Sequence, residues 1–170
     1  RLIAFFRDHF VDRDFSELAR PFGAVATDLQ RGREVWLREG GVSDAVRASI
    51  ALPGLFTPMR RDGSWLVDGG LVNNVPIDVV KVMGATRVIA VDVGTPPLTD
   101  EQLRSPISIT LQMITLVTQR LTNEILADLT DDDLLIRPEL GDISSAAFDR
   151  SAEAVRLGES AASDKAQCNQ

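Results

Sequence analysis

The chain of 170 residues has few of the side chains that bind metals or form disulfides, because it contains one cysteine and one histidine. A single cysteine, Cys168, excludes an internal disulfide and a CxxC metal motif. With His9 as the one histidine, a zinc site is also disfavoured. No GxGxxG or GxxxxGK[ST] motif follows a predicted strand, so a nucleotide-binding domain has no support. We expect neither a metal nor a cofactor.

Positive charge and long apolar runs are scarce as well. Lysine and arginine number 18 against 25 aspartates and glutamates, for a net charge of −7, and the basic residues are scattered among acidic ones. Since phosphate binding needs clustered basic side chains, we expect no nucleic-acid partner. No apolar run is as long as a membrane span. The apolar fraction of 44% and the charged fraction of 25% are ordinary for a globular protein.

The spacing of apolar residues predicts a chain that mixes helices and strands. Strands are predicted at 22–29, 33–40, 64–70, 87–94 and 134–138, with the first two paired across a turn. Helices are predicted at 2–10, from Ser43 to before Pro53, from Pro76 to before Gly84, at 106–129 and at 147–164. The continuous apolar character of 87–94 is typical of a strand buried on both faces. Strand, helix and strand from 64 to 94 predict a right-handed crossover onto a parallel sheet.

A carboxylate followed by two glycines ends the strand that reads WLVDGG. Ligands bind at strand ends in open α/β sheets, because the loops there form a crevice. Gly69 and Gly70 permit backbone angles that a side chain forbids and allow another group to approach Asp68 closely. The alternative is a turn aspartate that bonds to its own backbone.

Several segments around this motif resemble the patatin-like phospholipase family, in its bacterial branch related to neuropathy target esterase. In the family's order and spacing they read VATDL, AVRASIALPGLFTP, LVDGGLVNNVP and MGATRVIAVDVG, with DLLIRPELGDI further on. The resemblance covers nearly the whole chain. It implies a three-layer α/β/α fold with a mainly parallel sheet, and hydrolysis of lipid acyl esters by a Ser-Asp dyad. The aspartate of the family's D-G-[GA] motif falls on Asp68, with Gly69 and Gly70 supporting the loop, and acts as the base without a histidine.

The family's nucleophile, in a G-x-S-x-G elbow, and its oxyanion loop both precede the matching part. GVSDA around Ser43 and GESAA around Ser160 each differ from the elbow by one letter. We expect Ser43 to cap a helix and Ser160 to lie inside one, and neither position suits a strained strand-to-helix turn. Ser49 matches a recurring serine of the family that is not its nucleophile.

The chain also begins with Arg1, inside a helical pattern. We therefore expect residues 1–165 to be the C-terminal portion of one patatin-like domain, and residues 166–170 to be a polar tail. The missing N-terminal half is expected elsewhere in the protein or on another chain.

The function that the resemblance implies is lipid acyl-ester hydrolysis, as a phospholipase, lysophospholipase or esterase. This chain supplies the aspartate and is expected to be inactive alone. The alternative is a non-catalytic patatin-like module that binds lipid or a protein. The expected partners are a lipid or ester substrate and, transiently, a membrane surface. The resemblance implies a location in the cytoplasm or at the inner membrane of a bacterium.

Other polar residues have plainer interpretations. His9 is expected to be a packed or surface histidine. Asp28 and Asp92 could line the same crevice, but capping of sheet ends is favoured for both. Asn73 and Asn74 suit the turn that leads to the next helix, where they could steady the aspartate loop.

Three apolar or acidic segments also leave alternatives open. Residues 53–56 (Pro-Gly-Leu-Phe) could form a wall for an acyl chain, although core packing is favoured for the last two. The apolar stripe of 106–129 is expected in the core, with covering the acyl site or meeting a membrane as the alternative. The run of aspartates at 131–133 lacks the calcium-loop pattern, so a solvated turn is expected.

Overall fold

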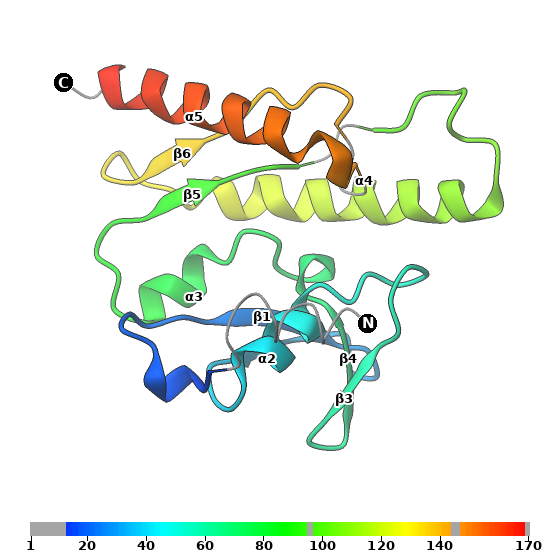
Figure 1. Cartoon of the computed structure of the whole chain (residues 1–170), viewed down its shortest axis with the longest axis vertical. Helices are drawn as coiled ribbons and strands as arrows, with labels where there is room; N and C mark the ends of the chain where they lie inside the picture. Colours follow the sequence, from blue (N-terminus) through cyan, green and yellow to red (C-terminus); the bar gives the residue numbers. More distant parts are fainter. Residues whose placement is uncertain (1–12, 95–96, 144–146, 169–170) are drawn as a thin grey trace. The chain divides into compact units, whose positions relative to one another are not determined.

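A computed structural model describes residues 13–94, 97–143 and 147–168, and the chain divides into two units, Arg1–Gly84 and Ala85–Gln170 (Figure 1). Its described helices and strands confirm the mixed α/β class. The helix predicted at 2–10, with His9, lies outside the described residues. The three-layer arrangement stays a prediction, as does the division into a domain at 1–165 and a tail.

The first unit is built on a four-stranded sheet with the order β2-β1-β4-β3. Its strands are β1 (Ala24–Asp28), β2 (Arg33–Leu37), β3 (Met59–Arg61) and β4 (Ser64–Asp68). The predicted pairing of the first two strands is confirmed, since β1 and β2 run antiparallel from Ala24↔Leu37 to Asp28↔Arg33. β1 lies in the middle of this sheet, so its backbone is held on both edges.

A two-residue hairpin sets the direction of β4. Asp62 and Gly63 have φ angles of 48° and 81°, which matches the left-handed turn that Asp-Gly favours between paired strands. The turn reverses the chain immediately before β4, which pairs antiparallel with β3 and with β1. The expectation of a mainly parallel sheet is therefore wrong for the described strands, of which β5 and β6 form the parallel pair.

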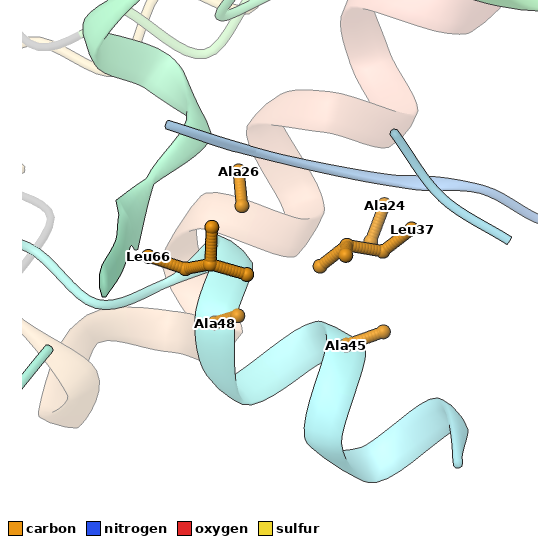
Figure 2. Packing of buried hydrophobic residues seen from close by; sticks show 6 residues of the cluster. All are labelled: Ala24, Ala26, Leu37, Ala45, Ala48 and Leu66. Atoms are coloured by element: carbon orange, nitrogen blue, oxygen red, sulfur yellow. The ribbon is translucent and has the colours of Figure 1, made fainter. Parts of the chain in front are cut away.

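Helix α2 (Val42–Ser49) covers this sheet through small side chains. Ala45 and Ala48 are fully buried against β1 and β4. Figure 2 shows them facing a cluster contributed by the strands: Ala24, Ala26, Leu37 and Leu66. Alanines at both contact positions let the helix backbone come close to the sheet, and the chain leaves α2 next to the end of β4.

The ends of the helices at 42–49 and 77–82 differ by one to three residues from the predictions. Gly41, not Ser43, is the N-cap of α2, and Ser43 is buried inside the first turn. The Val42 N–H, at the start of the helix, donates to the carbonyl of Arg13 at 2.9 Å. Helix α3 (Ile77–Val82) has Pro76 as its N-cap, whereas proline was expected at the first helical position. Gly84 follows its end with φ 103°, as expected.

The second unit contains β5 (Ile89–Val91), α4 (Pro106–Leu126), β6 (Leu134–Ile136) and α5 (Ser151–Cys168). α5 lies along β6 (Figure 1) and continues beyond the predicted end at 164. The parallel partner of β5 within this unit is β6, and the predicted crossover between the strands at 64–70 and 87–94 stays a prediction, because these strands belong to different units. β5 is not buried on both faces, since Ile89 is 67% exposed.

The long helix α4 begins as its sequence predicts, with a Ser105 capping box and a proline in the first turn. Its apolar stripe is less buried than expected, because Ile107 and Val117 are 68% and 58% exposed. No helix in the described part of the chain has the length and apolar character needed to cross a membrane.

Candidate active site at Asp68

The backbone of Asp68 is held by contacts with β1 and with the segment after α2. Asp68 is the last residue of β4, where it pairs with Ala26 of β1. Its N–H donates to the carbonyl of Ala51, just after α2, at 3.1 Å. Its carbonyl accepts from the hydroxyl of Thr27 at 2.7 Å. The central strand and the segment after α2 therefore fix where the carboxyl group begins.

The two oxygens of the Asp68 carboxyl group differ in their contacts. Oδ1 accepts the Gly70 N–H at 2.8 Å, as in the alternative that the sequence left open, a turn aspartate bonded to its own backbone. No described residue donates a hydrogen bond to Oδ2. One oxygen therefore orients the group while the other remains available to a partner.

Asp68 is half-buried, and this affects its acidity. Burial raises the pKa of the Asp68 carboxyl above its ordinary value, and the hydrogen bond from Gly70 opposes that rise. A higher pKa makes the ionised carboxylate a better acceptor of a proton from a hydroxyl group. The environment thus gives this carboxylate a property that a general base uses.

The two glycines lie against close neighbours, but without unusual backbone angles. Neither has a positive φ, so that part of the prediction is wrong. A Cβ at Gly69 would overlap the carbonyl oxygen of Val25 and lie 2.6 Å from its carbonyl carbon. A Cβ at Gly70 would lie 2.8 Å from Asn74 Oδ1 and 3.1 Å from Asp68 Oδ1. The close neighbours are the backbone of β1 and the loop itself.

Asp28 has the structural role that was favoured for it. Its carboxylate accepts the N–H groups of Gln30 and Arg31, the Arg31 guanidinium at 2.8 Å and the Ser64 hydroxyl at 3.0 Å. These bonds, with that of the Arg31 side chain the strongest, lower the pKa of Asp28 to about 2. Both oxygens are engaged, so Asp28 caps the β1–β2 turn.

Asp92 is likewise a capping residue, as favoured. It belongs to the second unit, where it pairs with Arg137 at 2.8 Å and accepts the Gly94 N–H at 3.0 Å. Among the residues that the structure describes, no group of three or more histidines, cysteines, aspartates or glutamates is placed to hold a metal ion.

The serines at the two elbow-like sequences lie in helices. Ser43 is buried within α2, and Ser160 is exposed within α5, as expected for the latter. Neither stands on a turn between a strand and a helix. The predicted partner of Asp68 is therefore not found at either sequence.

Residues 53–56 follow shortly after Ala51, whose carbonyl accepts the Asp68 N–H. Gly54 has φ 87°, and Leu55 is 53% exposed, so the favoured core packing is wrong for Leu55. Phe56 is half-buried with the Arg47 guanidinium 6.0 Å from its ring centroid. An exposed leucine in the segment next to Asp68 is compatible with the acyl-wall alternative.

Comparison with known proteins supports the resemblance. Residues 1–81 match the family model described as patatin-like phospholipase. A rat patatin-like phospholipase domain-containing protein 7 is 41% identical over 93 residues, which is 54% of this chain and 7% of the rat protein. Human patatin-like phospholipase domain-containing protein 6 is 39% identical over 93 residues, again 54% of this chain and 7% of the relative.

An uncharacterized NTE family protein of Mycobacterium tuberculosis is 42% identical over 78 residues, 46% of this chain and 22% of that protein. The chain thus covers less than a quarter of the length of these relatives. Residues 1–81, the segment that matches the family model, include Asp68, Gly69 and Gly70. Over residues 1–81, the chain is similar to the patatin-like phospholipase family.

Proposed function

We propose that Asp68 is the general base of a Ser-Asp dyad that hydrolyses acyl esters of lipids, with Gly69 and Gly70 shaping its loop. The observation that carries this proposal is the half-buried carboxylate at the end of β4, with Oδ1 held by Gly70 and Oδ2 unoccupied by any described donor. The serine is supplied by sequence outside these 170 residues. The patatin-like match and the names of the relatives support the choice of a lipid ester as substrate.

The chemistry requires Asp68 to take up and return one proton. As the serine oxygen attacks the ester carbonyl, its proton passes to Oδ2, and the protonated carboxyl group then gives the proton to the departing alcohol oxygen. Water then attacks the acyl-serine ester in the same way. Its proton passes to Asp68, which returns a proton to the serine oxygen as that bond breaks. The Gly70 N–H holds the carboxyl group in place, so Asp68 can act on the serine directly, without a histidine between them.

The test is Asp68→Asn in the full-length protein that contains these residues. Asparagine keeps the shape and the bond from Gly70, but cannot act as a base. We expect ester hydrolysis to fall by a factor on the order of 10²–10⁴ while the protein remains folded.

The matched control is Asp62→Asn, the same chemical change in the same sheet. The Asp62 side chain is 91% exposed, and asparagine tolerates its left-handed backbone. We expect this variant to retain normal activity. A folded Asp68→Asn protein with near-normal hydrolysis would refute the base assignment and would favour a non-catalytic patatin-like module.

A further inference from the structure

Asn73 connects the turn after Asp68 to two other elements. It is buried, with 4% of its surface exposed, and its backbone N–H donates to the carbonyl of Gly69 at 2.9 Å. Its side-chain Nδ2 donates to Glu34 Oε2 on β2 at 3.2 Å and to Asp78 Oδ1 on α3 at 2.9 Å. One side chain therefore links the turn to the sheet and to the next helix.

Stability alone does not explain an amide at this place. The orientation of the amide follows from its neighbours, since a flipped group would set its oxygen against two carboxylates. In the orientation observed, Asn73 Oδ1 is buried without a hydrogen-bond partner in the described part of the chain. A buried carbonyl oxygen without a partner destabilises a fold, and an apolar side chain of similar size would avoid that cost.

The contact between Asn73 and Gly69 reaches Asp68 through a single peptide group. The carbonyl of Gly69 and the N–H of Gly70 belong to the same planar unit and point in opposite directions. On one side the carbonyl accepts the N–H groups of Asn73 at 2.9 Å and of Val72 at 3.1 Å, and on the other the N–H donates to Asp68 Oδ1 at 2.8 Å. Fixing Asn73 therefore fixes the direction of the donor that orients the carboxylate.

We propose that Asn73 is a positioning residue for Asp68, which it aligns by clamping the Gly69–Gly70 peptide. This inference rests on the proposed function, because it concerns the base of that reaction. When the clamp is loosened, the Gly70 N–H spends less time on Oδ1. Since that bond favours the ionised carboxylate, the acid limb of the pH–rate profile moves to higher pH.

The charged groups around Asp68 have other partners, so they should not obscure the shift of the acid limb. Asp28 on β1 is paired with Arg31, and Arg47 on α2 donates to the carbonyl of Thr57 at 2.7 Å. Glu34 and Asp78 act on Asn73 itself. Burial raises the pKa of Asp68, and the Gly70 bond lowers it. A change in the Gly70 bond is therefore expected to appear in the profile.

The experiment compares Asn73→Leu with Val79→Ala in the full-length protein. Leucine cannot donate to Glu34 or Asp78, so we expect kcat/KM to fall about tenfold and the acid limb to rise by about half a pH unit or more. Val79 is buried on α3, so Val79→Ala leaves a cavity and lowers the melting temperature without touching the clamp. Its acid limb is expected to stay at the wild-type position.

Asp78 provides a second pair of variants if Asn73→Leu does not fold. Asp78→Ala and Asp78→Asn remove the same charge, but asparagine retains an oxygen that can accept from Asn73. We expect the alanine variant to have the higher acid limb of the two.

The positioning role would be overturned if the acid limb lay at the same pH in Asp78→Ala and Asp78→Asn. It would also be overturned if folded Asn73→Leu kept the acid limb of the wild-type protein. Neither result would bear on the proposed function, which fails separately if Asp68→Asn remains active.

Discussion

The glycines that follow Asp68 face neighbours of different mobility. Gly69 lies against the backbone of Val25, which is central in the sheet, whereas Gly70 lies against the side chains of Asn74 and Asp68. The backbone of Val25, held in the sheet by its pairing with β2, cannot retreat, but an exposed side chain can. The same substitution should therefore have unlike effects at these two positions.

Gly69→Ala is expected to lower the free energy of unfolding by about 3 kcal/mol, because the new methyl group overlaps Val25. The control is Gly158→Ala inside α5, where nothing lies within 4 Å of an added Cβ. There alanine should raise the free energy of unfolding by about 0.5–1 kcal/mol, since glycine weakens a helix interior. Urea unfolding measures both, and a Gly69→Ala protein as stable as wild type would contradict the packing.

Gly70→Ala should affect activity more than stability. Asn74 is exposed and can turn aside, so we expect a loss of about 1 kcal/mol in the free energy of unfolding. The methyl group would still press on Asp68 Oδ1 and on the peptide that orients it. In the full-length protein, we expect the rate of ester hydrolysis to fall much more than the fraction of folded protein does. Urea unfolding of the same variant measures that fraction. Unchanged hydrolysis would mean that the orientation of Oδ1 is unimportant.

Asp68→Asn should make the protein more stable at pH 7. Burial raises the pKa of the folded-state carboxyl above its ordinary value of 3.8. Stability from such a group is complete below the unfolded pKa and is lost as the pH rises through the folded pKa. Melting temperatures at pH 7 and pH 3 test this prediction. We expect the variant to melt at a higher temperature than wild type at pH 7, and the difference to be much smaller at pH 3. A less stable variant at pH 7 would show that the ionised carboxylate is satisfied.

At the level of elements, the sequence predicts most helices and strands but not how the strands pair. Apolar patterns locate β1, β2 and β4 to within three residues. The parallel sheet was expected because a strand, a helix and a strand follow one another after Ser64. The Asp62-Gly63 turn, whose signal was present in the sequence, instead commits β4 to antiparallel partners.

The candidate site is likewise predicted only in part from the sequence. Asp68 could be found from its motif, because a carboxylate before two glycines at a strand end is a local pattern. Its supports are not local: Thr27 lies 41 residues from Asp68 in sequence, and Glu34 lies 39 residues from Asn73. Sequence patterns of helices and strands do not specify such contacts, which depend on the order of strands in the sheet.

The β1–β2 turn should lose stability in acid through Asp28. Its folded pKa of about 2 lies below the ordinary 3.8, chiefly because of Arg31. The stabilisation is therefore present above the unfolded pKa and is lost as the pH falls through about 2. Asp28→Asn should be less stable than wild type at pH 6, with the difference shrinking toward pH 2. Urea unfolding at pH 6, 4 and 2 tests this, and a constant difference would exclude the ion pair as its cause.

At the scale of the whole chain, the family match and the first structural unit nearly coincide. The match ends at residue 81, and the unit ends at Gly84. This unit holds Asp68, its glycines and Asn73, together with Glu34 and Asp78, which bond to Asn73. The second unit leaves apolar side chains of α4 and β5 exposed, among them Met113, Leu116 and Val91.

The 170 residues alone are expected to show no turnover of short p-nitrophenyl esters. They contain the proposed base, but no described serine donates to Asp68. Ser43 is buried in α2, and Ser64 is bonded to Asp28, so neither can be activated by Asp68 without rearrangement. The purified chain and its Asp68→Asn variant should therefore match the rate of buffer, whereas the full-length protein should exceed it. Turnover by the chain that disappears in Asp68→Asn would mean that the nucleophile lies within these residues after all.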